Sequence, residues 1–200
     1  MTEEMDSFFE GVINKCDRLY DKGEKEEALK CIISAGGKYK DKASLLNHYR
    51  VMLLSELGRT GEAIKIADEL VQEEPDNPLS YGVKGICLFK MGKLDEALKF
   101  LKIALKFNPN IHEFNFLAFI VITAKTAKNS PEADAYLNKA MELNPSLTVS
   151  LLKDDLDKFL KKAKLTNEET MRLKTTMANL EKKLQRLEDL KKKMIKSRKK

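Results

Sequence analysis

The sequence predicts an all-α protein built from repeated pairs of helices. Two features predict this fold: a short motif ending in Glu-Ala recurs every 34 to 36 residues, and prolines follow the motif at a constant distance. The composition agrees, because 42% hydrophobic and 34% charged residues in a chain of 200 are enough to bury a core. We therefore expect a soluble globular chain rather than a disordered one.

The repeated motif occupies residues 23–28, 58–63 and 92–97, and a weaker fourth copy occupies residues 128–133. Its last residue is always alanine, and three of the four alanines are followed twelve residues later by proline. The alanines are Ala28, Ala63, Ala97 and Ala133, and the prolines are Pro75, Pro109 and Pro145. So regular a period predicts one helix pair per copy.

Each position of the motif has a physical role in a helix pair. Glycine ends the first helix, because it enters the left-handed region without steric cost. The glutamate lies in the first turn of the second helix, where the helix dipole favours negative charge. Alanine lets two antiparallel helices approach closely, and proline ends the second helix because it cannot continue it.

With these residues the chain resembles the tetratricopeptide-repeat family, most clearly over residues 78–111. That copy carries the family's residues at the family's spacing, namely Tyr81, Gly85, Leu88, Gly92, Ala97, Leu101, Ala104 and Pro109. The other copies would occupy residues 9–42, 44–77 and 114–147. The resemblance implies a right-handed helical solenoid of four helix-turn-helix repeats, closed by a capping helix over residues 148–165. Together these form a predicted domain over residues 1–165.

Five positions depart from the family pattern. Lys40 replaces the proline of the first copy, and Lys128 replaces the turn glycine of the fourth. The small residue that faces the partner helix is Cys16 in the first copy, whereas Val51 and Val121 stand there in the second and fourth. Terminal repeats are often atypical because they close the stack. We expect these departures to affect the geometry of the fourth repeat most.

Residues 166–200 are predicted to form a second element, a long basic helix. Thr166 and Glu169 have the spacing of a capping box that opens a helix. Apolar residues then follow a heptad pattern, which predicts helix pairing. They are Leu173, Met177, Leu180, Leu184, Leu187 and Met194. Three readings stay open for this helix: a coiled-coil homodimer or assembly scaffold through residues 170–195, pairing with a partner's helix, or docking onto the repeats.

Charge is divided unevenly along the chain. Residues 1–147 carry a net charge of −3, whereas residues 148–200 carry +9. Seven basic residues lie within the last ten: Lys191, Lys192, Lys193, Lys196, Arg198, Lys199 and Lys200. Such a basic tail suits nuclear import, a nucleic-acid arm, an anionic membrane surface or a solvated helix end. It contains no aromatic residue for base stacking, which disfavours single-stranded nucleic acid.

In the tetratricopeptide-repeat family the first helices of successive repeats line a groove that binds partners. Carried over by spacing, the groove here would contain Ile13, Asp17, Tyr20, Leu45, His48, Met52, Leu79, Ile86, Phe89 and Ile122. It would also contain Glu10, Glu56, Lys90, Asn115, Ala118 and Lys125. Its apolar character favours a partner helix or hydrophobic peptide, unless the C-terminal helix of the chain covers it.

Some family members clamp the C-terminal carboxylate of heat-shock chaperones with lysine, arginine and asparagine side chains. The matching positions here are Ile13, Asp17, Tyr49, Leu79 and Val83, which offer no fork of cationic donors. Any co-chaperone-like function would therefore work without that clamp. The sequence predicts a protein-binding adaptor or scaffold instead, with a nucleic-acid-associated factor as the last alternative.

No pattern of catalytic or metal-ligating residues is visible in the sequence. His48 and His112 are far apart, and neither has cysteine or carboxylate neighbours at metal-site spacing. Cys16, Cys31 and Cys87 form no C-x-x-C pair and suit a reducing compartment. We expect a non-enzymatic chain without cofactor, located in the cytoplasm, with the nucleus as the alternative. The absence of an apolar stretch of about twenty residues predicts no membrane span.

Overall fold

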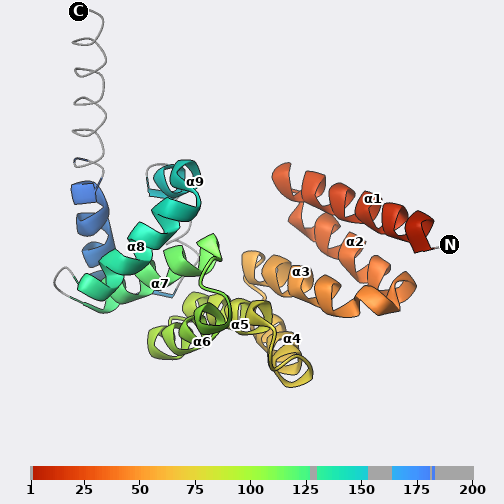
Figure 1. Cartoon of the computed structure of the whole chain (residues 1–200), viewed down its shortest axis with the longest axis horizontal. Helices are drawn as coiled ribbons and strands as arrows, with labels where there is room; N and C mark the ends of the chain where they lie inside the picture. Colours follow the sequence, from red (N-terminus) through yellow and green to blue (C-terminus); the bar gives the residue numbers. More distant parts are fainter. Residues whose placement is uncertain (1, 127–129, 153–163, 181, 183–200) are drawn as a thin grey trace, which may run out of the picture. The chain divides into compact units, whose positions relative to one another are not determined.

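The computed structural model describes residues 2–126, 130–152, 164–180 and 182, and this part of the chain is helical without a strand (Figure 1). It forms two compact units, which are considered separately below. Unit 1 comprises Met1–Pro109 and unit 2 comprises Asn110–Lys200. The all-α tetratricopeptide-repeat fold predicted from the motif is confirmed.

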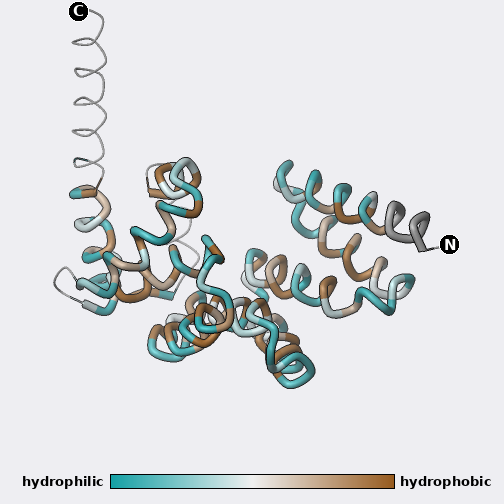
Figure 2. Tube along the Cα trace, viewed as in Figure 1, coloured by the Kyte–Doolittle hydropathy of each residue, from teal (hydrophilic) through white to brown (hydrophobic). Residues whose placement is uncertain are grey.

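Unit 1 contains three helix pairs in sequence order. They are α1 (Thr2–Asp21) with α2 (Lys25–Lys38), α3 (Ala43–Glu56) with α4 (Thr60–Glu73), and α5 (Pro78–Lys90) with α6 (Leu94–Phe107). Each pair packs internally, and α2 on α3, α4 on α5 and α3 on α5 join successive pairs. Hydrophobic residues of paired helices face one another, as α1 and α2 illustrate (Figure 2). A short 3₁₀ turn, η1 (Lys40–Lys42), stands where the first copy lacks its proline.

The three turn glycines of unit 1 adopt the backbone conformation expected of them. Gly23, Gly58 and Gly92 have φ values of 81°, 76° and 76°. In each turn the glycine and the following residue donate backbone hydrogen bonds back to the end of the first helix, as in Gly92 N to Phe89 O and Lys93 N to Leu88 O, both 2.9 Å. Two orphan carbonyls are satisfied in this way, so the chain reverses sharply.

Small residues set the spacing inside each pair. Ala28, Ala63 and Ala97 are fully buried, as predicted. Gly85 on α5 has no room for a side chain, because a Cβ atom there would lie 2.9 Å from the Cγ of Leu101 on α6. Helices α5 and α6 are therefore closely packed at this position.

The predicted prolines end the second helices. Helix α4 stops at Glu73, two residues before Pro75, and α6 stops at Phe107, two residues before Pro109. Pro145 has two roles, because it follows the end of α8 and is also the first residue of α9. Its fixed φ suits the first turn of a helix, where its missing N–H costs nothing.

Unit 2 contains α7 (His112–Lys125), α8 (Pro131–Leu143), α9 (Pro145–Ser150) and a further helix over residues 167–180, here called the C-terminal helix. The predicted capping box opens that helix: Glu169 N donates to Thr166 Oγ1 at 3.2 Å, and Thr166 N donates to Glu169 Oε2 at 2.7 Å. Lys128 and most of the predicted capping helix, residues 153–163, lie outside the described residues. No helix in the described part is long and apolar enough to cross a bilayer.

Candidate functional site

The first helices of unit 1 present a run of exposed apolar side chains. Leu45 and Met52 lie seven residues apart on α3, and Leu79 and Ile86 occupy the same places one repeat later on α5. Leu45, Met52 and Leu79 are 40%, 49% and 39% exposed, and Ile86 is half-buried. Because α3 packs directly on α5, these side chains form two neighbouring apolar rows.

Helix α1 extends this surface with polar and aromatic residues. Asp17 and Tyr20 are exposed, and Ile13 is half-buried. Asp17 lies near Tyr49 of α3: burial, and then the negative charge of Asp17, raises the pKa of the Tyr49 hydroxyl. We call this surface the first-helix face, defined by Asp17, Tyr20, Leu45, Tyr49, Met52, Leu79 and Ile86.

An ion-pair network lies at one end of the first-helix face. Glu56 at the end of α3 accepts from Lys90 Nζ of α5 at 2.5 Å and from Lys25 Nζ of α2 at 2.7 Å. Lys90 is only 4% exposed, and the Lys25 ammonium also lies over the Tyr20 ring, 4.8 Å from its centroid. One carboxylate thus joins all three repeats of unit 1 and fixes the rows relative to one another.

Besides Lys90, two further residues predicted to line the groove are instead buried in unit 1. Phe89 is fully buried, and His48 is 5% exposed with its ring held between Ser44 O at 2.8 Å and Ser80 Oγ at 3.1 Å. On its own helix, each of these side chains is rotated by about 50° about the helix axis from the row that carries Met52 or Ile86. Both side chains therefore point into the packing between repeats. The spacing alone does not distinguish these two orientations.

The polar contacts of His48 continue to Glu74 at the end of α4. Ser80 Oγ lies 3.2 Å and Asn77 Nδ2 lies 2.7 Å from Glu74 Oε2. Burial alone would raise the pKa of Glu74, but hydrogen bonds from Ser44, Asn77 and Ser80 outweigh it and hold that pKa below its usual value. The network closes the α4–α5 turn and is structural in character.

Helix α7, the described first helix of the fourth repeat, offers no comparable exposed face. Ile122 is 3% exposed, and twelve of the fourteen residues of α7 are buried, including Asn115 and Ala118. The C-terminal helix lies against the end of α7: Arg172 donates to Ala124 O at 3.3 Å and to Lys125 O at 3.1 Å, and also pairs with Glu168. Of the predicted groove residues on α7, Asn115, Ala118 and Ile122 are therefore buried and Lys125 is exposed.

The heptad residues divide between buried positions and positions outside the described residues. Leu173 and Met177 are 0% and 2% exposed within unit 2, and Leu180 is half-buried. Leu184, Leu187 and Met194 lie outside the described residues, as do Lys191, Lys192, Lys193, Lys196, Arg198, Lys199 and Lys200. The first two heptad positions are therefore buried, and Arg172 of the same helix contacts the end of α7.

Tyr49 and Lys25 join this site without having been predicted for it. Tyr49 follows Leu45 by four residues, so helical spacing would have placed it on the same face. Lys25 begins a second helix and carries no such signal in the sequence. Its place in the site depends on the folding of α2 back along α1 after Gly23, which brings its ammonium group to Tyr20 and Glu56.

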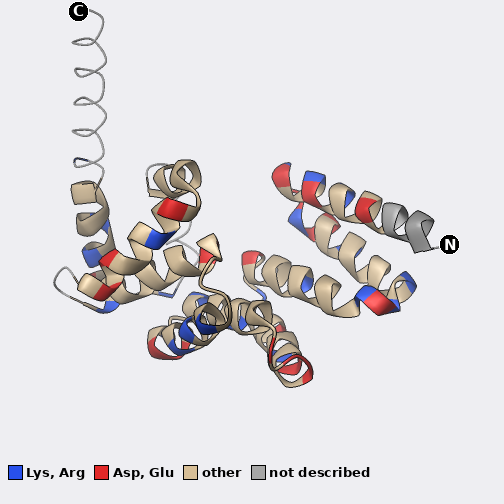
Figure 3. Cartoon of the chain, viewed as in Figure 1, with Lys and Arg blue, Asp and Glu red and all other residues tan. Residues whose placement is uncertain are grey.

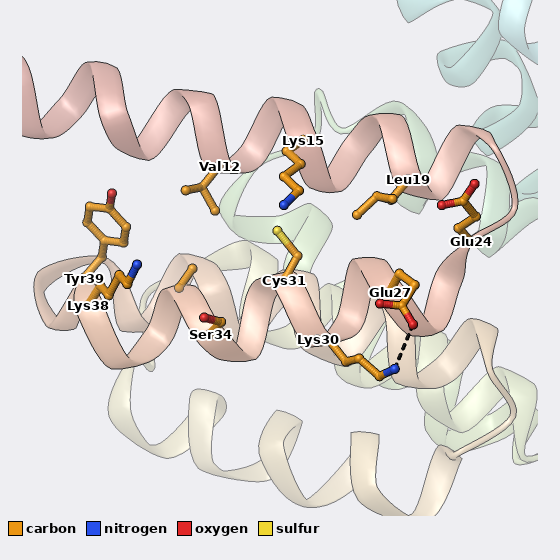
Figure 4. A pocket seen from close by; sticks show the side chains of 11 residues that line it. Val12, Lys15, Leu19, Glu24, Glu27, Lys30, Cys31, Ser34, Lys38 and Tyr39 are labelled. Carbon is orange, nitrogen blue, oxygen red and sulfur yellow. Dashed lines mark hydrogen bonds and ion pairs between the residues drawn. The ribbon is translucent and has the colours of Figure 1, made fainter.

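A second surface feature is a pocket of about 660 Å³ between α1 and α2 (Figure 4). Val12 and Leu19 of α1 face Cys31 and Ala35 of α2, and the rim carries both charge signs, including Lys30 paired with Glu27 at 2.7 Å. Cys16 lies next to Cys31, and burial, helped by Cys31, raises the pKa of Cys16 to about 12. Such a thiol is a poor nucleophile, because little thiolate exists near neutral pH.

Nothing in the described residues forms a catalytic or metal-binding group. No cluster of three or more His, Cys, Asp or Glu side chains is placed to hold a metal ion there. His112 is buried, and its Nε2 lies 2.8 Å from Thr148 Oγ1, whose single hydroxyl proton lies within reach of two carbonyl oxygens, Asn144 O at 2.7 Å and Ala140 O at 3.1 Å. This histidine joins α7 to α9 rather than forming part of a reactive group.

Comparison with known proteins agrees with this geometry. Residues 54–114 match the family model described as tetratricopeptide repeat. Over residues 54–114 the chain consists of tetratricopeptide repeats. Repeats of this family are scaffolds on which other proteins bind, so protein–protein interaction is the general function of the fold. No curated protein sequence matches the chain.

Several solved structures share the fold at low sequence identity. TTC0263, a thermophilic tetratricopeptide-repeat protein of Thermus thermophilus, is 19% identical with a TM-score of 0.58, covering 85% of this chain and 97% of that one. MamA of Desulfovibrio magneticus RS-1, from residue 41 to its end, is 15% identical with a TM-score of 0.52, covering 68% and 76%. O-GlcNAc transferase of Thermobaculum terrenum has 14% identity and a TM-score of 0.58, covering 68% of this chain but 26% of that one. These likenesses describe the repeat fold.

Proposed function

We propose that this tetratricopeptide-repeat protein is an adaptor whose first-helix face binds the apolar side of a helix or peptide from a partner protein. The observation that carries the proposal is the exposure of Leu45, Met52 and Leu79, each about two-fifths or more, on adjacent helices. Scattered exposed apolar residues are ordinary, but a contiguous set on one face is typical of an interaction surface.

The chemistry of the face favours an apolar ligand over a terminal carboxylate. Leu79 and the buried Val83 stand where a carboxylate clamp would need cationic donors, and Lys90 is already held by Glu56. A partner helix with apolar residues at i, i+3 or i+4 and i+7 would match the seven-residue spacing of Leu45 and Met52. A co-chaperone-like role would have to use this apolar recognition.

The test is affinity capture from native cell extract with two full-length variants of equal charge change. Met52→Asp/Leu79→Asp places two charges in the apolar rows, and any bound partner should be lost because its apolar side chains would be buried against carboxylates. Ile33→Asp/Met171→Asp is the matched control, since Ile33 and Met171 are 50% and 68% exposed and lie off the first-helix face.

Circular dichroism of both variants should show unchanged helix content, because all four positions are exposed. Proteins that wild type and the control variant both capture, and that Met52→Asp/Leu79→Asp does not, would support binding through the first-helix face. A partner captured equally by all three chains would refute it and would direct attention to residues 166–200.

A further inference from the structure

The first-helix face has an acidic border on α1. Glu10, Asp17 and Asp21 are exposed and follow one stripe of the helix, at spacings of seven and four residues. Asp17 is close enough to Tyr49 to influence its pKa, which places this stripe beside the apolar rows of α3. Figure 3 shows acidic residues along the described part of α1. A ligand lying across the rows would therefore meet negative charge on its α1 side.

The lysines at the end of the first-helix face that carries Glu56 form ion pairs with that carboxylate. Lys25 and Lys90 both bind Glu56, at 2.7 and 2.5 Å. Lys42 precedes α3 and therefore the first apolar residue of its row, Leu45, and its ammonium group lies over the Phe9 ring, 5.9 Å from the ring centroid. Counting Glu10, Asp17, Asp21 and Glu56 against Lys25 and Lys90, the face and its border carry a net charge of −2. Its electrostatics favour a cationic ligand.

The chain itself contains a segment of complementary chemistry. Residues 183–200 carry nine basic and two acidic residues, a net charge of +7. Apolar residues recur within them at Leu184, Leu187 and Met194, continuing the heptad series whose earlier members, Leu173 and Met177, are buried in unit 2. A cationic segment with one apolar stripe matches both the rows and the acidic border.

We propose that residues 183–200 of one copy dock on the first-helix face of a second copy, and that the exchange is reciprocal. Leu184, Leu187 and Met194 would cover the rows formed by Leu45, Met52, Leu79 and Ile86, and the lysines would lie along the acidic border. The proposal rests on the proposed function of the same face and names its occupant. Reciprocal docking forms two identical interfaces in a twofold dimer, so each contact strengthens the other.

The experiment is sedimentation equilibrium of the full chain over a range of concentrations at low salt. Wild type should form a dimer whose dissociation constant rises at least about tenfold at moderate salt, because opposed surface charges are screened. Two charge-reversed chains should each be monomeric, since face and tail then carry like charge: E10K/D17K gives a face of net +2 beside the +7 tail, and K191E/K192E/K193E/K196E/K199E gives a tail of net −3 beside the −2 face. Mixing them should restore a heterodimer, because both interfaces regain opposite charges.

The matched control is E69K/E73K, which makes the same change of charge at two exposed positions of α4. It should dimerise like wild type. Wild type that stays monomeric at every concentration would overturn the inference, whether the tail is free or docked on its own chain. A dimer that survives E10K/D17K but is lost in L184D/L187D would also overturn it, in favour of a coiled coil.

The inference and the proposed function fail separately. A monomeric wild type that still captures a protein lost in Met52→Asp/Leu79→Asp would refute self-docking and leave partner binding intact. If both that capture and the dimer survive Met52→Asp/Leu79→Asp, the first-helix face itself is not a binding surface and both proposals are refuted.

Discussion

The first helices of the second and fourth repeats occupy the same place in the motif, yet they differ in what covers them. Met52 on α3 is 49% exposed, whereas its counterpart Ile122 on α7 is 3% exposed. Both positions carry a large apolar side chain, so the difference does not come from residue type. It comes from the surroundings, and one contact that α7 makes and α3 lacks is that of the C-terminal helix, which reaches the end of α7 through Arg172. An apolar first-helix face is thus a potential interface that the chain itself can occupy.

The difference between the buried and the exposed region is tested most directly by truncating one side chain in each. Leu173→Ala should lower the free energy of unfolding of unit 2 by about 2–5 kcal/mol, because a fully buried leucine is lost and a cavity remains. Met52→Ala should change the free energy of unfolding by no more than about 0.5 kcal/mol, since its side chain is exposed. Urea denaturation followed by circular dichroism measures both.

Equal, small effects of the two truncations would contradict the packing of the C-terminal helix on unit 2. Hydrogen exchange by mass spectrometry localises the change. In Leu173→Ala, peptides from α7 should exchange faster than in wild type, while peptides from α3 and α5 should not.

The third and fourth repeats carry different residues at the position where the first helix of the pair meets the second. Gly85 has Leu101 Cγ 2.9 Å from where a Cβ would stand, whereas the corresponding residue of α7 is Val121, fully buried. Gly85→Ala should therefore cost about 1–3 kcal/mol through overpacking. Gly61→Ala is the control, because nothing lies within 4 Å of its Cβ position, and it should be neutral or slightly stabilising. Chemical denaturation that finds the two variants alike would disprove the close contact.

Much of the fold could be predicted because the repeat motif encodes local geometry. Gly23, Gly58 and Gly92 have positive φ, the motif alanines are buried, and Thr166 and Glu169 form their capping box. These features depend on residues within one helix pair or one turn. The exposed residues of the candidate site on α1, α3 and α5 were predicted differently, by carrying the groove of the resembled family over to the matching positions of each repeat.

The rest of the site could not be predicted because it depends on contacts distant in sequence. His48 turns inward to Ser80, 32 residues away, and the Lys25–Glu56–Lys90 network joins three helices. The cover over α7 depends on Arg172, 48 residues from Ala124. Periodicity identifies a helix face, but a rotation of about 50° decides between surface and core. Heptad spacing likewise fits pairing between chains and packing within one.

Alkaline pH should lower the stability of unit 1 through its buried thiols and should have no such effect on unit 2, because all three cysteines lie in unit 1. The native pKa values of Cys16 and Cys87 are raised to about 12 and about 11, in both cases mainly by burial. The native chain therefore keeps protons that the unfolded chain releases above pH 9. The stabilising contribution is complete below that pH and is lost as pH rises towards the native pKa values. The slope should approach about −1.4 kcal/mol per pH unit for each thiol.

The measurement is the free energy of unfolding between pH 8 and pH 10.5 in wild type and in Cys16→Ala/Cys87→Ala. The double variant will be less stable throughout because it loses packing, so the comparison concerns slopes. A flatter pH dependence in the variant supports buried, protonated thiols. Parallel lines would show that other groups cause the alkaline loss.

The smallest expected effect concerns the polar anchor of the C-terminal helix. Arg172 donates to the carbonyls of Ala124 and Lys125, at the end of α7 where the helix leaves such groups without intrahelical partners. Arg172→Ala should cost unit 2 about 1 kcal/mol, since water can reach the half-buried site and replace part of the interaction. Lys174→Ala, on the exposed side of the same helix, is the control and should have less effect. If Arg172→Ala speeds hydrogen exchange in α7 alone, the guanidinium group acts as a cap on the end of α7. If exchange also rises over residues 167–180, the guanidinium group holds the C-terminal helix against α7. That second outcome would identify the contact that distinguishes α7 from α3.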